Sequence, residues 1–213
     1  MKFTNLSFNL NIFAAYKMIM NRSDIVNVIA KKINAENYLQ IGVYDGSYFK
    51  NVKCDYKIGV DPDPSSKALI IQNSDFFFAF NKAKFDIILI DGIHTQKQVT
   101  RDIINSLKFL NNDGYIVCSN INPEQESLQT DFYQGGSWTG TCWKSFVELR
   151  KTRDDLFMAV VDTDFGCGLI TRGKQEIIKI EEPITYQLLE SRRKELLNLI
   201  SIDQFNDLMT NGI

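Results

Sequence analysis

The stretch Asn37-Tyr-Leu-Gln-Ile-Gly-Val-Tyr-Asp-Gly46 is a short apolar run that breaks at Gly42 and continues through polar residues to a second glycine. A second stretch, Phe85-Asp-Ile-Ile-Leu-Ile-Asp-Gly-Ile-His94, has the same form. Buried parallel strands have this composition where they end at a ligand-binding crevice. Because a glycine turn before a helix brings backbone N–H groups close to an anion, the first stretch predicts a site for a nucleotide-like cofactor.

The composition is that of an ordinary globular domain. The chain has 213 residues, 44% hydrophobic and 23% charged, with a formal net charge of −2. We therefore expect one main domain and no nucleic-acid partner. No apolar stretch reaches the ~20 residues that a membrane span requires, so we expect no membrane association. The four cysteines show no metal-binding spacing, which together with a poor signal-peptide pattern predicts reduced thiols in a cytoplasmic protein.

Strand-like and helix-like segments alternate along the first two thirds of the chain, which predicts βαβ units and a parallel sheet. Helices are expected after the cap residues Ser23 and Thr95. The apolar stripe of the helix after Thr95 runs to Leu110, and Asn111-Asn112-Asp113-Gly114 is expected to stop that helix. Strands are expected at 37–43, 56–61, 68–72, 85–91 and 114–118. Another helix is expected near 140–151. Two apolar runs, 156–162 and 167–171, lie too close together for a crossover and predict an antiparallel hairpin. Helices near 185–200 and 202–209 close the chain.

The spacing of the glycines bears on the type of cofactor. A dinucleotide fingerprint starting at Gly42 requires glycine at positions 44 and 47, where the chain has Tyr44 and Ser47. A nicotinamide-binding domain would also continue with parallel strands where a hairpin is expected. Both observations oppose a nicotinamide-dependent oxidoreductase. Asp61 ends the second strand about twenty residues after Gly42, where an acid can bind ribose hydroxyls; alternatively, it is a turn residue held by the neighbouring prolines.

With these features, the chain resembles the class I S-adenosylmethionine-dependent methyltransferases, in the branch called the methyltransferase domain 24 family. The likeness rests on 38–46 with 59–63, on 74–77, on 85–123 and on 138–144, and it covers roughly residues 23–175. It implies an α/β fold with a Rossmann-like, doubly wound, seven-stranded sheet. That sheet is mostly parallel, with an antiparallel C-terminal hairpin strand and helices on both faces. We expect an N-terminal leader at 1–22 that can be helical, the methyltransferase domain at 23–175, and a helical extension at 176–213.

The resemblance also implies a binding site for S-adenosyl-L-methionine. The Gly42–Gly46 turn would hold the methionine end and Asp61 the ribose. Asp75 would accept from the adenine amino group beside an apolar wall from Phe76 or Phe77, unless Asp75 only caps a helix. Gln40 stands where many relatives have an acid. The expected cofactor-binding residues are Gln40, Gly42, Tyr44, Gly46, Asp61, Ser74, Asp75, Phe76 and Asp91.

Asp91 and His94 are the expected catalytic residues. Asp91 follows the apolar run 87–90 and should lie at the carboxyl end of a central strand, where sheets of this type place reactive groups. His94 is the only histidine. A neutral imidazole can remove a hydroxyl proton during methyl transfer; alternatively, His94 bonds to the backbone and fixes its turn.

Metal-dependent relatives carry acidic ligands at the end of the fifth strand, where this chain has Ser119 and Asn120. Magnesium prefers carboxylate oxygens, so no metal ligands are assigned and metal dependence is doubtful. Asn120, Tyr133 and Trp138 are expected to contact the substrate, whereas Trp143 is expected to anchor its helix in the core.

The leading hypothesis is therefore O-methylation of a small hydroxylated acceptor such as a sugar or polysaccharide precursor. The alternative is a cofactor-binding scaffold that has lost its chemistry, which Gln40, Ser119 and Asn120 would mark. The sequence leaves the oligomeric state open.

Overall fold

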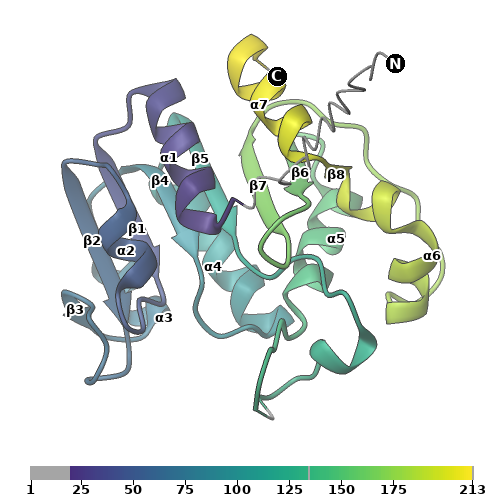
Figure 1. Cartoon of the computed structure of the whole chain (residues 1–213), viewed down its shortest axis with the longest axis horizontal. Coiled ribbons are helices and arrows are strands. Elements are labelled where there is room, and N and C mark those ends of the chain that lie inside the picture. Colours follow the sequence, from purple (N-terminus) through teal and green to yellow (C-terminus); the bar gives the residue numbers. More distant parts are fainter. Residues whose placement is uncertain (1–19, 134, 213) are drawn as a thin grey trace, which may run out of the picture.

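A central β-sheet organises the molecule, which we describe from a computed structural model that covers residues 20–133 and 135–212 (Figure 1). The strands are β1 (Asn37–Ile41), β2 (Tyr56–Asp61), β3 (Ile70–Ile71), β4 (Phe85–Ile90), β5 (Leu110–Cys118), β6 (Leu156–Val161), β7 (Cys167–Arg172) and β8 (Leu199–Ile200). The helices are α1 (Arg22–Ile33), α2 (Ser47–Asn51), α3 (Ser74–Phe80), α4 (Gln96–Phe109), α5 (Cys142–Thr152), α6 (Tyr186–Leu197) and α7 (Ile202–Asn211), with a 3₁₀ turn at Glu126–Leu128. The expected leader falls almost entirely outside the described residues.

The strand order is β3-β2-β1-β4-β5-β7-β6-β8. Strands β1 to β5 are parallel, and the chain winds outward from β1 in one direction and from β4 in the other. Ile41 and Ile90, the last residues of β1 and β4, are paired in register. In open sheets of this kind, ligands bind outside the carboxyl ends of the strands where the winding direction changes. The topology therefore places a binding crevice beyond Ile41 and Ile90.

The expected hairpin is present. Strand β7 is antiparallel to both β5 and β6, and the short link 162–166 joins the two hairpin strands. Asp164, Phe165 and Gly166 all have positive φ angles, which gives this link its tight curvature. The sheet differs from the expected seven strands by one: Leu199 and Ile200 add a short eighth strand that runs parallel to β6. Two residues are too few for a period-two pattern to reveal them in the sequence.

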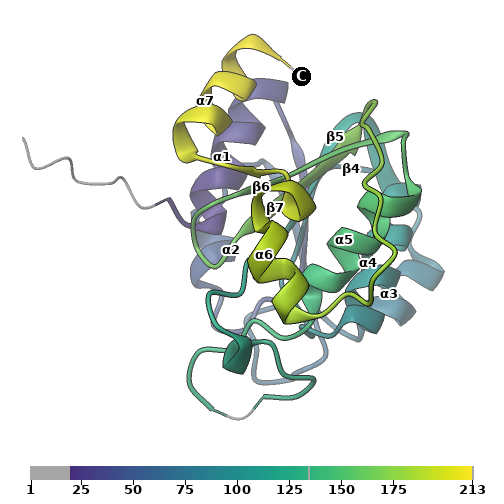
Figure 2. The ribbon, with the colours of Figure 1, turned by 90° about the vertical axis from the view of Figure 1, so that its right-hand side faces the viewer.

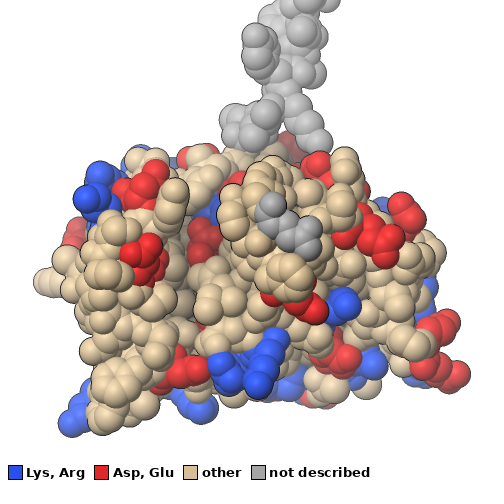
Figure 3. Space-filling view, turned by 90° about the horizontal axis from the view of Figure 1, so that it is seen from below, with Lys and Arg blue, Asp and Glu red and all other residues tan. Residues whose placement is uncertain are grey.

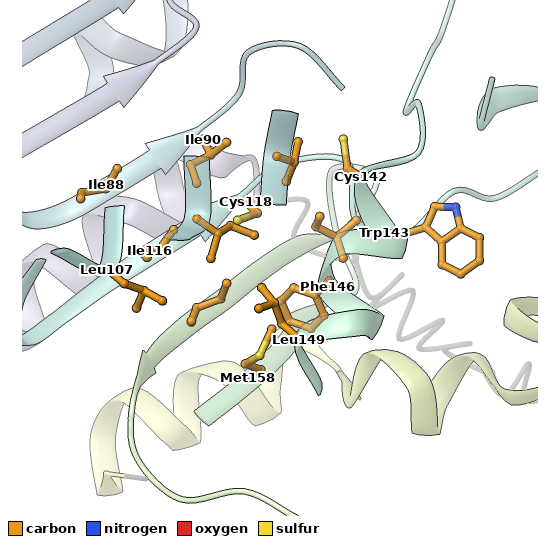
Figure 4. Packing of buried hydrophobic residues seen from close by; sticks show 14 of the residues in the cluster. Ile88, Ile90, Leu107, Ile116, Cys118, Cys142, Trp143, Phe146, Leu149 and Met158 are labelled. Carbon is orange, nitrogen blue, oxygen red and sulfur yellow. The ribbon is translucent and has the colours of Figure 1, made fainter. Parts of the chain in front are cut away.

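Helices cover both faces of the sheet (Figure 2). One apolar cluster joins the sheet to α3, α4, α5 and α6, and another joins it to α1 and α7. Figure 4 shows the first cluster, in which Ile88, Cys118 and Phe146 come from elements far apart in the sequence. Trp143 is fully buried, as expected for the anchor of its helix. The sequence of β4 does not alternate between apolar and polar residues, because helices cover both faces of this strand.

Some element boundaries differ from the sequence predictions. The cap of α1 is Asn21, whose side chain accepts from the backbone N–H groups of Ser23 and Asp24, so Ser23 lies inside the helix. Helix α4 ends at Phe109, and Leu110 begins β5 instead of closing the helix stripe. The polar residues 111–114 belong to β5, but only Leu110 and residues 115–118 of this strand pair with β4, so 111–114 form a bulge. The expected strand 68–72 is reduced to Ile70–Ile71.

All four cysteines are buried free thiols. None of the helices within the described residues has both the length and the apolar character that crossing a bilayer would require.

Candidate active site

A cavity of about 260 Å³ opens at the carboxyl ends of β1, β2 and β4. Figure 3 views the molecule from this end and shows acidic side chains set in hollows of the surface. The lining residues come from five separate segments of the chain: Ile41, Gly42, Tyr44, Val60, Asp61, Pro62, Asn73, Ser74, Asp91, Gly92, Ile93, Gln98 and Asp102. Apolar walls with a few converging polar groups are typical of small-molecule sites. The cavity coincides with the crevice that the topology predicts.

Gly42 is required by its surroundings. Its φ is +82°, and a Cβ atom placed there would lie 2.2 Å from the carbonyl oxygen of Asp91. The backbone N–H of Asp91 donates to the carbonyl of Ile41 at 2.8 Å, so the backbone pairing of β1 with β4 continues one residue beyond β4. Only glycine combines this conformation with so close an approach. The turn after β1 therefore lies directly against the end of β4.

Asp61 organises the same turn. One carboxylate oxygen accepts from the backbone N–H groups of Val43 at 2.8 Å and Tyr44 at 3.0 Å. The other oxygen accepts from the backbone of Asp63 at 2.9 Å. Asp61 thus holds the glycine turn and the turn after β2 together, and it still lines the cavity. The carboxylate has spare lone pairs that a bound hydroxyl can use, because each oxygen can accept more than one bond.

Gln40 is buried just below the cavity floor. Its amide nitrogen donates to the carbonyl of Gly42 at 2.8 Å, and its amide oxygen accepts from the Tyr38 hydroxyl at 2.8 Å. Gln40 therefore supports the turn from beneath and is not among the lining residues. Gly46 also lies outside the lining, as the left-handed cap residue that begins α2.

At the start of α3, the structure divides the residues expected to meet the adenine. Ser74 lines the cavity, together with the cap residue Asn73. Asp75 and Phe76 do not line it: Asp75 forms an ion pair of 3.0 Å with Arg101, and the Phe76 ring packs on Phe80. Phe77 is buried in the core. The apolar walls come instead from Ile41, Val60, Pro62 and Ile93.

Asp91 lies where β4 ends and is almost fully buried. Its Oδ1 accepts from Arg22 at 2.5 Å and from the Ser119 hydroxyl at 2.5 Å. The Nε2 of His94 lies 3.7 Å from the same oxygen, too far for a hydrogen bond but within reach of electrostatic attraction. Burial alone would raise the pKa of Asp91, but His94, Arg22 and Ser119 together lower it. Asp91 is therefore an ionised carboxylate within a buried polar network.

Arg22 is the largest addition to the site that the sequence did not reveal. It lies in the first turn of α1, is 7% exposed, and bonds to Asp164 in the hairpin link through both its backbone N–H and its Nε, each at 2.8 Å. Its guanidinium also lies 3.5 Å from the Asn120 amide oxygen and 4.8 Å from the centre of the Tyr48 ring. Burial opposes its charge, but the hydrogen bond to Asp164 and the charge of Asp91 outweigh this and raise its pKa. Arg22 thus links α1, β4 and the hairpin through charge.

His94, Asn120 and Trp138 lie together. The Asn120 amide nitrogen is 3.1 Å from both ring nitrogens of His94, and the rings of His94 and Trp138 are centred 5.1 Å apart. Gly140 allows this approach, since a Cβ atom there would lie 1.9 Å from the carbonyl oxygen of His94. Tyr133 packs edge-on against Trp138 at 6.0 Å and is exposed. These side chains form a cluster, the His94 cluster, next to the cavity, because His94 directly follows the lining residues 91–93.

Comparison with known proteins agrees with this geometry. Residues 58–121 match the model of the methyltransferase domain family Methyltransf_24. The fold is similar to that of SAH-bound PaMTH1, a methyltransferase from Podospora anserina, with a TM-score of 0.55 and 12% identity over 71% of this chain and 78% of that chain. The chain thus matches a methyltransferase domain model over part of its length, and it shares its fold with a methyltransferase.

Two further solved structures have a similar fold. One is a candidate O-methyltransferase from Klebsiella pneumoniae, with a TM-score of 0.56 and 13% identity over 75% of this chain and 83% of that chain. The other is the O-methyltransferase TomG from Streptomyces achromogenes, in complex with S-adenosylmethionine, with a TM-score of 0.51 and 14% identity over 70% of this chain and 78% of that chain. No curated protein matches the sequence. The resemblance and the fold class expected from the sequence are confirmed.

The candidate site also includes residues with no recognisable sequence signal. Gln98 and Asp102 on α4 line the cavity, although in the sequence they read as the polar face of an amphipathic helix. Arg22 and Asp164 are 142 positions apart, so only the fold brings them together. Ser119 stands where metal-dependent methyltransferases carry an acidic ligand, and its hydroxyl donates to Asp91.

Proposed function

We propose that this chain transfers a methyl group from S-adenosylmethionine to an oxygen atom of a small hydroxylated acceptor. The observation that carries the proposal is the position of the cavity, at the switch point of a class I methyltransferase sheet and next to the buried Asp91 and His94. Two proteins of similar fold are described as O-methyltransferases, which favours oxygen as the methylated atom.

The residues of the cavity suit S-adenosylmethionine. The turn from Gly42 to Gly46 would hold its methionine end, Asp61 its ribose hydroxyls and Ser74 the region of its base. Pro62 and Ile93 supply apolar surface for a flat ring. Bound there, S-adenosylmethionine supplies a methyl group on a positively charged sulfur that is open to in-line attack by oxygen.

The neighbouring His94 cluster would act on the acceptor. His94 would remove the proton of the attacking hydroxyl as the new bond to the methyl carbon forms. The ionised Asp91, 3.7 Å from His94, would stabilise the imidazolium that results. Arg22 would hold Asp91 in place, while Asn120 orients the imidazole and Tyr133 and Trp138 contact the acceptor. Positioning of the reactants and exclusion of water would supply most of the rate enhancement.

A catalytic magnesium ion does not fit this arrangement. The Asp91 oxygen that would bind a metal already accepts from Arg22 and Ser119, and Arg22 also lies against Asn120. Within residues 20–133 and 135–212, no group of three or more acidic, histidine or cysteine side chains is arranged to hold a metal ion. A fixed guanidinium therefore provides the positive charge next to Asp91, and we propose that the reaction needs no divalent metal.

Calorimetric titration with S-adenosylmethionine and S-adenosylhomocysteine, with and without magnesium, tests the cofactor. Micromolar, magnesium-independent binding of both is expected, and no binding of either would refute the proposal. Formation of S-adenosylhomocysteine is then followed across hydroxylated acceptors, beginning with sugars and polysaccharide precursors. If the protein binds the cofactor but methylates none of a broad set of acceptors, the alternative of a degenerate scaffold is the better explanation.

The variants His94→Ala and Asp91→Asn test the proposed chemistry. Each should lower turnover about 10²-fold or more, because His94→Ala removes the general base and Asp91→Asn removes the charge that stabilises its imidazolium. His94→Ala should also leave cofactor affinity within a few-fold. Asp203→Asn, at an exposed position of α7, is the control for removing one carboxylate. Unchanged turnover in both test variants would show that these assignments are wrong.

A further inference from the structure

Asp102 on α4 has an unusual environment. It is 1% exposed and lines the cavity. Its Oδ1 accepts from the Gln98 amide at 3.0 Å. Its Oδ2 is buried and has no hydrogen-bond partner among the described residues. A buried oxygen of a carboxylate is usually paired, since leaving it without a donor is costly.

The charges around Asp102 do not compensate for its burial. Burial raises the pKa of Asp102 to about 6, although Ser74 and Gln98 favour the ionised form. Among the charged neighbours, Asp75 on α3 raises this pKa and Arg101 on α4 lowers it. The thiol of Cys118 on β5 is also close enough to interact with Asp102. Burial thus disfavours the ionised form of Asp102, and its Oδ2 lacks a hydrogen-bond donor among the described residues.

Asp75, the acid expected from the sequence to meet the adenine, is in the opposite situation. Its oxygens are engaged by Gln98 at 3.3 Å and by Arg101 at 3.0 Å, and its side chain is 45% exposed. The Gln98 amide also contacts the Ser74 hydroxyl at 3.1 Å, so it bridges the start of α3 to Asp102. The polar group that is both in the cavity and unsatisfied is thus Asp102.

We propose that Asp102 accepts a hydrogen bond from the amino group of the cofactor's adenine and thereby selects the base; this assignment rests on the proposed use of S-adenosylmethionine. Adenine presents an amino donor at position 6, whereas hypoxanthine and guanine present a carbonyl oxygen there. A carboxylate pairs with the first and repels the second. The base is then selected by Asp102 on α4 and not by Asp75 on α3.

The test is titration of the full-length protein with S-adenosylhomocysteine and with S-inosylhomocysteine, in which a carbonyl replaces the amino group. The wild-type protein should prefer the adenosyl compound by at least about tenfold, because a buried acceptor left facing a carbonyl is penalised. Asp102→Asn should weaken adenosyl binding by about tenfold or more and reduce or reverse the preference, because its amide can turn a donor toward the carbonyl.

Two further variants complete the test. Asp75→Asn tests the competing assignment, and Asp203→Asn on α7 controls for the loss of one negative charge. Thermal melts monitored by circular dichroism establish that each variant is folded. Tight binding of S-adenosylhomocysteine with the same base preference in wild type and Asp102→Asn would overturn this inference and leave the proposed function standing. A change of preference in Asp75→Asn alone would also overturn it, whereas no binding by the wild type would refute the proposed function itself.

Discussion

Replacing Asp102 by asparagine should stabilise the ligand-free protein. Burial raises the pKa of this carboxyl from its ordinary value of 3.8 to about 6. Each pKa unit corresponds to about 1.4 kcal/mol between the two protonation states, so ionised Asp102 destabilises the fold by about 3 kcal/mol at pH 7.5. Asparagine keeps the shape of the protonated acid and carries no charge. The variant should therefore gain up to about 3 kcal/mol, which is a large share of the stability of a typical domain.

The sign of the pH dependence follows from the direction of the pKa change. The folded state binds the Asp102 proton more tightly than the unfolded state, so this group makes the wild type less stable as pH rises from about 4 to about 6. The advantage of Asp102→Asn should accordingly shrink from about 3 kcal/mol at pH 7.5 to about 1.5 kcal/mol at pH 5.

Urea denaturation followed by circular dichroism at these two pH values measures the difference, with Asp203→Asn as the matched control. The control should change stability by less than about 0.5 kcal/mol, as exposed surface substitutions do. A loss of stability in Asp102→Asn at pH 7.5, or a gain that is the same at both pH values, would refute the view that this carboxylate is strained. Saturating S-adenosylhomocysteine should reverse the ranking, because the ligand stabilises only the form that binds it well.

Other substitutions test the remaining parts of the site. Gly42→Ala should abolish cofactor binding and destabilise the fold by well over 1 kcal/mol, as measured by calorimetry and urea denaturation, because its Cβ would overlap the Asp91 backbone; a normal affinity would contradict the described turn. Arg22→Met should cost about 3–5 kcal/mol of unfolding free energy, since it leaves Asp91 and Asp164 without their partner. Arg22→Lys, which keeps the positive charge, should lose less stability and serves as the comparison. Equal stability of wild type and Arg22→Met would show that the ion pairs of Arg22 with Asp91 and Asp164 are not buried in solution. Trp138→Ala should raise the acceptor KM with little effect on cofactor affinity, and the reverse pattern in steady-state kinetics would place Trp138 on the cofactor side.

The sequence predicted the parts of this fold that depend on strong local patterns. The apolar runs at β1 and β4 and the close spacing of β6 and β7 indicated the sheet and its hairpin, because burial and chain length leave few alternatives. The polar stretch 111–114 was expected to stop the preceding helix, and that helix ends at Phe109; the stretch then forms a bulge within β5, between the pairs that Leu110 and Tyr115 make with β4. The short β8 was missed because its pairing with β6 is a tertiary effect that no local preference encodes.

The site could be predicted only in part. The end of each strand pointed to Gly42, Asp61 and Asp91, which the structure brings together around one cavity. Arg22 could not be found, because its partners lie 69 and 142 positions away. Asp102 could not be distinguished from an ordinary polar residue on α4, since burial of a helix face depends on what packs over it.

The cavity and the His94 cluster differ in how much of the chain they require. Every residue that lines the cavity lies between positions 41 and 102, within one continuous run of the sequence. The His94 cluster and the ion pairs next to it instead combine Arg22, Asn120, Trp138 and Asp164. During synthesis the first could form early, whereas the second must wait for the hairpin. For protein engineering, exchange of the segment that carries Tyr133 and Trp138 should change the acceptor while the cofactor is recognised as before.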